Sequence, residues 1–160
     1  MTEPRLTATE DAAWRGFLRS HERIWDELER RLNRLGISMG EYSALALLAD
    51  AGPQGMSISE LAEQRLMSSS GFSRLADRLE GRGLIQRRRS TRDGRSFEAV
   101  LTDAGRALLR KAWRQHHQDL HELFMDKLDP SQLEQLAEIW GRLSDDGKPP
   151  SIPRRRGAAD

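Results

Sequence analysis

The sequence predicts a mainly α-helical protein with a small β wing, and three observations support this fold class. Apolar residues recur at spacings of three and four over most of the chain, which marks one face of a helix. Ser, Thr or Asp residues stand directly before these segments, where they can cap helix N-termini. One short region, residues 84–101, instead follows the two-residue period of β-strands.

The longest N-terminal apolar stripe predicts a helix over about residues 9–35, which ends before Gly36. A second helix follows at once. Ser38 and Glu41 have the spacing of a capping box, in which each side chain accepts a hydrogen bond from the other residue's backbone N–H. The apolar pattern then continues to about Asp50, before a Gly-Pro turn.

Two shorter helices are predicted next. Ser57 and Glu60 form another capping box, and the helix that they open breaks at Leu66-Met67. The serine cluster 68–70 begins the following helix, which Gly83 ends. Two short helices with a tight connection, and polar residues at the start of the second, describe a helix-turn-helix.

The region of alternating residues predicts a two-stranded wing. Leu84-Ile85 enters one strand, and Phe97, Ala99 and Leu101 alternate with polar or smaller neighbours in the other. Asp93-Gly94 between them is a hairpin turn signal. Arginines on both sides of the turn make the tip basic.

Two amphipathic helices complete the pattern. Thr102 caps a long helix through Leu128, and Asp129 caps the last helix, with Pro130 at its first position and Gln132 completing a capping box. A small monomer could not leave so much apolar surface exposed, so we expect a homodimer. The residues that form this surface are Leu120, Phe124, Leu128, Leu136, Ile139, Trp140 and Leu143.

The chain therefore reads as a single domain over residues 1–146. Its winged helix-turn-helix, about 38–101, stands between dimerisation helices of about 9–35 and 103–145. The tail 147–160 holds no core-forming residues, and we expect it to be disordered.

Composition and charge narrow the function. The 160 residues carry a net charge of +1, but residues 65–95 hold nine arginines against three acidic residues, a local charge of +6 that favours a polyanionic partner. Cysteine is absent, which excludes disulfides and thiol-based sensing. We expect no membrane span and no signal peptide, and hence a cytoplasmic protein without contact to the membrane.

The order of elements and three local motifs resemble the MarR family of bacterial regulators over roughly residues 10–145. The motifs are ISMGEYSALALL, ISELAEQRLMSSSGFSRLADRLEGRGLI and RDGRSFEAVLTDAG. The last is the most specific, because it joins an Asp-x-Arg wing tip to a strand and a Leu-Thr-x-x-Gly sequence.

This resemblance implies a triangular homodimer with interlocked terminal helices and a winged helix-turn-helix at each lower corner. Family members typically repress transcription. Many release DNA when a small phenolic or aromatic acid binds between the dimer helices and the DNA-binding lobe. Two recognition helices would then read a near-palindromic operator in double-stranded DNA.

Residues at the start of the recognition helix can reach bases or phosphates, and the wing can reach the minor groove and the backbone. Arg95 matches the family's minor-groove arginine, which Asp93 would hold through a bidentate pair. The basic residues Arg87, Arg88, Arg89 and Arg92 are expected to meet phosphates. The complete DNA-binding set is Ser69, Ser70, Ser73, Arg74, Arg78, Arg87, Arg88, Arg89, Arg92, Asp93 and Arg95.

The first helix offers a candidate effector site. Arg15 borders an apolar stripe that contains Trp14 and His21, and an arginine at such an edge suits a carboxylate. We expect Arg15 to hold a small aromatic acid, with His21 donating a hydrogen bond and Trp14 or Trp113 forming an apolar wall. The same combination resembles the subgroup that responds to protocatechuate. Alternatively, Arg15 pairs with Asp11 on a solvated face and His21 is an interface residue.

Three histidines, His116, His117 and His121, offer a metal-responsive alternative, because the last two are one helical turn apart. A zinc site needs a third and usually a fourth ligand. The zinc-responsive family members take ligands from the second helix, where this chain has Tyr42 and Ser43. A DNA binder without any effector is the other alternative. No nucleophile or carboxylate pair accompanies the histidines, so we expect neither an enzyme nor a cofactor.

Overall fold

The computed structural model describes residues 5–64, 69–90 and 97–144, and it confirms the predicted fold class. The helices are α1 (Ala8–Asn33), α2 (Met39–Ala51), α3 (Ile58–Gln64), α4 (Ser69–Gly81), α5 (Asp103–Leu123) and α6 (Pro130–Leu143). Two short 3-10 helices are η1 (Gly52–Gln54) and η2 (Met125–Lys127). The strands are β1 (Met56–Ser57), β2 (Ile85–Arg89) and β3 (Phe97–Leu101).

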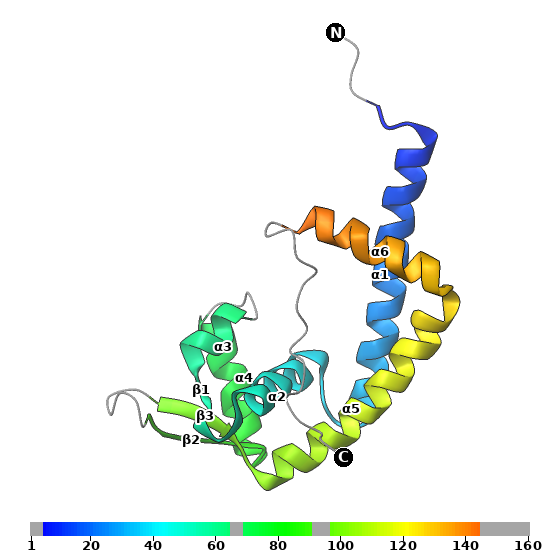
Figure 1. Ribbon diagram of the computed structural model, residues 1–160. Coiled ribbons are helices and arrows are strands. Elements are labelled where there is room, and N and C mark those ends of the chain that lie inside the picture. The colour runs from blue at the N-terminus through cyan, green and yellow to red at the C-terminus, as the bar shows by residue number, and fades with distance from the viewer. Residues whose placement is uncertain (1–4, 65–68, 91–96, 145–160) are drawn as a thin grey trace.

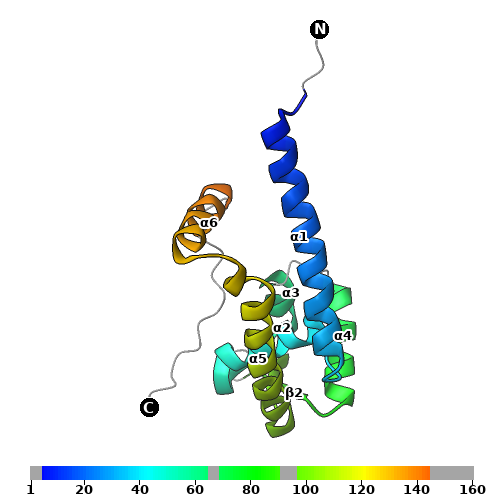
Figure 2. The same cartoon turned by 90° about the vertical axis from the view of Figure 1, so that its right-hand side faces the viewer.

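The elements form two parts with different shapes (Figure 1). Helices α2, α3 and α4 and the sheet gather into a compact lobe, which we call the 39–101 lobe. The long helix α5 leads away from this lobe and lies beside the lower half of α1. Helix α6 passes across α1 in the view of Figure 1, and the rotated view in Figure 2 shows it to one side of α1, whose first turns extend beyond it.

The predicted capping boxes begin their helices as the sequence indicates. In Ser38–Glu41, Ser57–Glu60 and Asp129–Gln132, each first side chain accepts the backbone N–H of the second residue, and the return bond is present in each. The first helix starts slightly before the predicted position, because Thr7 and Glu10 form a further box. Four side-chain caps thus set where α1, α2, α3 and α6 begin.

The core lies within the 39–101 lobe and extends between the C-terminal half of α1 and one side of α5. Helix α1 contributes only two buried residues, Leu28 and Leu32, both in its last two turns. Phe72, Leu45 and Leu79 are among the largest side chains that are wholly buried. The first half of α1 and all of α6 therefore lie outside the core of a single chain.

The two predicted wing strands are present, since β2 pairs antiparallel with β3, but the prediction missed a third strand. Among the described residues the sheet has the order β1-β3-β2. The added strand β1 pairs with β3 through Met56 opposite Ala99 and Ser57 opposite Glu98. Two residues are too few to show any period in the sequence. The pairing brings Gly55, at φ +73°, against the Ala99 carbonyl, where a side chain would collide.

The burial of side chains along β3 also differs from what the alternating sequence pattern predicts. Ala99 and Leu101 are buried as expected, but Phe97 is exposed and Glu98 is buried. The hydroxyl of Ser90 donates a 2.6 Å hydrogen bond to Glu98 Oε1, which partly offsets the cost of burying a carboxylate.

Helix α5 ends five residues before the predicted limit at Leu128. The backbone leaves the helical region at Phe124, with φ −137° and ψ −63°, and η2 follows. Leu128 is half-buried and keeps the apolar spacing of the helix. The sequence pattern therefore does not reveal that the helix has already ended. Among the described residues, no helix is both long and apolar enough to cross a membrane.

Candidate nucleic-acid interface

The predicted recognition helix is α4, which buries one face and exposes another. Phe72, Leu75 and Leu79 point into the core, at the helical spacing of three and four. Arg74 and Arg78, one turn apart, are exposed on a different face. The helix therefore offers two guanidinium groups to solvent from a rigid base, which is the arrangement that contacts to DNA require.

Part of the predicted interface lies outside the described residues. Arg92, Asp93 and Arg95 belong to this part, and so do the side chains of Ser69 and Ser70. Ser73 is described and half-buried on α4. The minor-groove role of Arg95 stays a prediction.

Three consecutive arginines on β2 have three different surroundings. Arg87 reaches α4, where its Nη1 lies 2.6 Å from Asp77 Oδ1. Arg88 points to the other side and donates from Nη2 to the carbonyls of Pro53 and Gln54, the latter at 3.1 Å. Arg89 is exposed, with its guanidinium carbon 6.0 Å from the centre of the Phe97 ring.

A further arginine, Arg82, connects the end of α4 to the junction between α1 and α2. Its Nη1 lies 3.2 Å from both carboxylate oxygens of Glu41, and its Nη2 donates to the Gly36 carbonyl at 2.6 Å. The Nε of Arg78 lies 4.0 Å from the same Glu41 carboxylate. Sequence reasoning assigned Glu41 only to capping α2, because spacing along one helix does not show partners on another.

The candidate effector residues on α1 lie within a row of exposed rings. Trp14 contacts Phe17, with ring centres 5.8 Å apart, and Phe17 contacts His21 at 6.0 Å. His21 stacks on Trp25 at 5.9 Å and an interplanar angle of 20°. Phe17 also lies 5.6 Å from Trp140 of α6. We call these five rings the aromatic row.

Arg15 beside this row is exposed and paired. Its Nε donates a 2.8 Å hydrogen bond to Asp11 Oδ1, which is the alternative that the sequence left open. A ligand carboxylate at Arg15 would therefore compete with Asp11.

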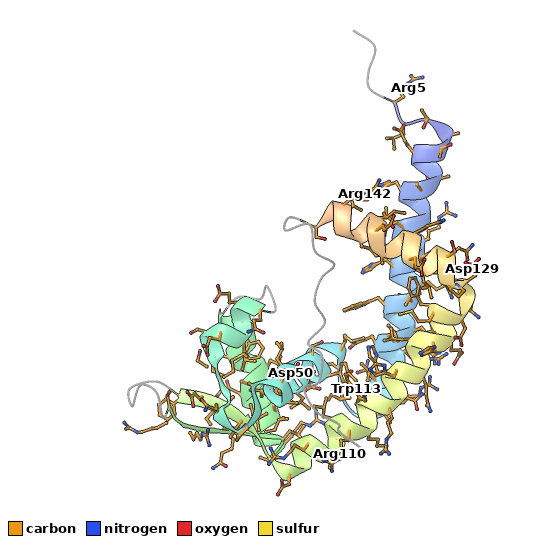
Figure 3. All side chains as sticks on the ribbon, viewed as in Figure 1. Arg5, Asp50, Arg110, Trp113, Asp129 and Arg142 are labelled. Atoms are coloured by element: carbon orange, nitrogen blue, oxygen red, sulfur yellow. The ribbon has the colours of Figure 1, made fainter. Side chains whose placement is uncertain are left out.

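Trp113 lies elsewhere in the chain. It sits on α5 close to α2 (Figure 3), whereas the first half of α1 extends away from that region. Its ring contacts His117, with centres 4.0 Å apart, and it packs against the core. Within one chain the structure brings Trp14 and His21 together and does not bring Trp113 to them.

The histidines of α5 that the sequence offered as metal ligands contact other side chains of this chain. His116 is half-buried under Tyr42, with ring centres 4.8 Å apart. Burial lowers the pKa of His116 and raises that of Tyr42 to about 12. His121 Nδ1 lies 3.2 Å from Asp126 Oδ1. In the described part of the chain, no three His, Asp or Glu side chains gather as a metal site would require.

Comparison with known proteins agrees with this geometry. A family model described as MarR family matches residues 35–96. The transcriptional repressor MprA of Escherichia coli (strain K12) is 31% identical over 121 residues, which are 76% of this chain and 68% of MprA.

Solved structures show the same likeness. Sco3205, a MarR family transcriptional regulator from Streptomyces coelicolor solved in complex with DNA, is 32% identical with a TM-score of 0.78, over 89% of this chain and 91% of Sco3205. CouR from Rhodococcus jostii RHA1, solved bound to p-coumaroyl-CoA, shares the fold at a TM-score of 0.69 and 22% identity, over 86% of this chain and 93% of CouR. The relatives are transcriptional regulators and not enzymes, and the chain belongs to the MarR family.

Proposed function

We propose that this protein is a homodimeric repressor in the bacterial cytoplasm that binds a near-palindromic DNA operator and leaves it when a small aromatic carboxylate binds. The observation that carries the DNA-binding part is the exposed pair Arg74 and Arg78 on a helix whose opposite side is anchored in the core. A relative of similar fold, Sco3205, was solved with DNA, and the relative MprA is a repressor.

Dimerisation is supported by the large apolar side chains that a single chain leaves in water. Trp14 is 54% exposed and Trp25 is 46% exposed, and both belong to the aromatic row. Ile139, Trp140 and Leu143 of α6 are exposed as well. A second copy that covers these residues would bring two α4 helices to one duplex, at half-sites roughly 34–36 Å apart.

The proposed DNA contacts fall into two groups. Side chains at the start of α4 would read bases in the major groove, and those in the wing would meet phosphates and the minor groove. Arg95 enters the minor groove and Asp93 orients it. The proposed contacts are Ser69, Ser70, Ser73, Arg74, Arg78, Arg88, Arg89, Arg92, Asp93 and Arg95.

Selection of binding sites from a random duplex library tests operator recognition. We expect the wild type to enrich one near-palindrome, and Arg95→Ala to lose nearly all preference for it over random DNA. Arg110→Ala, an exposed arginine on α5, serves as the control and should bind like the wild type. A wild type that enriches no sequence would contradict the proposed function, and equal losses on both DNAs would make Arg95 a phosphate contact only.

The effector part of the proposal rests on the aromatic row and on Arg15 beside it. Trp14 and His21 present an apolar wall with a hydrogen-bonding ring, and the Arg15 guanidinium is the nearby cation that a carboxylate needs. CouR shows that a protein of this fold can hold a derivative of an aromatic acid. Protocatechuate is the proposed representative of the class.

Calorimetric titration with protocatechuate, salicylate and benzoate tests this assignment. Arg15→Ala should lose roughly ten-fold or more in affinity, because a charge-assisted hydrogen bond contributes about 1.5–3 kcal/mol. Asp11→Asn should bind more tightly than the wild type, since it removes the competing carboxylate. If Trp113→Ala weakens binding instead and Arg15→Ala does not, the ligand binds at α5. If the wild type binds no aromatic acid, the effector class is wrong.

A further inference from the structure

The side chain of Arg87 on β2 contacts three residues of the recognition helix α4. Its Nη1 lies 2.6 Å from Asp77 Oδ1 and 3.3 Å from Glu80 Oε2, and its Nη2 donates to the Ser73 carbonyl at 3.4 Å. The Arg87 backbone N–H also donates to Glu80 Oε1 at 2.9 Å. All these acceptors belong to α4, and they are four and three residues apart, which places them along one side of the helix.

This side of α4 differs from both faces described above. At 100° per residue, positions 73, 77 and 80 fall about a third of a turn from the core face of Phe72 and Leu79. They fall about as far from the exposed face of Arg74 and Arg78. Arg87 therefore holds α4 from the one direction that neither the core nor a duplex on the Arg74 face would occupy.

The positive charge of the Arg87 guanidinium is more than balanced within this contact. Arg87 is only 26% exposed, and two carboxylates share its guanidinium. A phosphate would have to displace Asp77 or Glu80 before it could bind Arg87, and it would then meet the carboxylate it displaced. The neighbouring Arg89 is exposed and lies on the same strand, so it suits a phosphate better.

We infer that Arg87 is a positioning residue that sets the angle of the recognition helix against the wing, and not a phosphate contact. The inference rests on the proposed function, since it concerns how the operator is read. Bases in the major groove are read through geometry, so a tilted α4 loses specific contacts while its phosphate contacts persist. Lysine at this position would keep the charge but not the planar fork that reaches several acceptors.

The test compares affinity for the selected operator and for a random duplex at several salt concentrations. We expect both Arg87→Lys and Arg87→Ala to lower the ratio of the two affinities roughly ten-fold, comparable to a mismatched base pair, with the salt dependence unchanged. Arg89→Ala is the matched control on β2, and it should weaken both DNAs equally. Circular dichroism checks that each variant is folded.

A double-mutant cycle with Asp77→Asn separates the two roles of Arg87 further. If Arg87 acts through α4, Asp77→Asn lowers the ratio too, and the double variant with Arg87→Ala is little worse than either single variant. If Arg87 binds phosphate, Asp77→Asn frees it and raises affinity for every duplex.

The outcomes separate this inference from the function on which it rests. The positioning role alone would be overturned by two results together. Arg87→Lys would keep the wild-type ratio of operator to random-duplex affinity, and Arg87→Ala would lower the slope of log affinity against log salt by about one unit. A wild type that selects no sequence would overturn the proposed function and this inference with it.

Discussion

Gly105 occupies a position where no side chain fits, although it lies in the first turn of an ordinary helix. A β-carbon there would overlap the carbonyl oxygen of Leu84, which leads into β2. That carbonyl cannot move freely, because it accepts hydrogen bonds from the Thr102 backbone at 3.2 Å and from the Thr102 hydroxyl at 3.1 Å. The glycine lets α5 begin directly against the wing, and it belongs to the Leu-Thr-x-x-Gly motif that the sequence displays.

Gly105→Ala is therefore expected to destabilise the fold by about 1–3 kcal/mol, the usual cost of overpacking. Gly16→Ala is the matched control in α1, where an added β-carbon meets nothing within 4 Å. The control should stabilise the protein by about 0.5–1 kcal/mol, since alanine favours helix more than glycine does. Urea unfolding measures both, and equal midpoints would contradict the predicted collision.

At the scale of elements, α1 and α5 are joined by one half-buried arginine. Arg31 Nη1 donates to Asp119 Oδ1 at 2.8 Å, its two Nη atoms reach Glu122, and its Nε donates to Glu27 at 2.6 Å. Asp119 is only 1% exposed and receives a further bond from Gln115. The hydrogen bonds from Arg30 and Arg31 lower the pKa of Glu27 to about 2.

Arg31→Ala should destabilise the protein by about 3 kcal/mol, because it leaves the Asp119 carboxylate buried without its cation. Arg30→Ala, at the adjacent and exposed position, should cost less than about 1 kcal/mol, as surface pairs do. Thermal unfolding of both variants beside the wild type distinguishes them. A loss in Arg31→Ala no larger than that in Arg30→Ala would show that Asp119 finds another partner.

Sequence patterns predicted the elements well and the contacts between them poorly. Local signals such as Ser38–Glu41 and Asp129–Gln132 predicted where helices begin, since both partners lie within one turn. The strand β1 was missed because its evidence is a pairing with β3, some forty residues away in the chain. The partners of Arg31 and Arg87 were missed for the same reason.

At the scale of the whole molecule, the aromatic row and α6 form an apolar surface that the core does not use. Phe17 is 41% exposed despite its contact with Trp140, and Leu143 at the end of α6 is 70% exposed. Sequence reasoning predicted that the α6 part of this surface forms a dimer interface. It predicted an effector site at Trp14 and His21 of α1, and this stays a prediction, since a helical stripe does not show what covers it.

Trp140→Glu should dissociate the proposed dimer at micromolar concentration, because it places a charge in the centre of the apolar surface. Arg142→Glu is the control, two residues further along α6 and exposed (Figure 3). Sedimentation velocity should give a monomer for the first variant and a dimer for the second. A wild type that sediments as a stable monomer would contradict dimerisation itself.

Helix α6 has no buried residue within its own chain, although it is 14 residues long. An isolated helix of that length is marginal in water, so α6 needs a surface to stay folded. A newly made chain that has not met a second copy therefore carries a segment open to proteases. The lifetime of the protein would then rise with its concentration, since dimerisation shields α6 of both copies. A cell producing few copies should lose them disproportionately fast, which would sharpen the threshold at which this regulator begins to act.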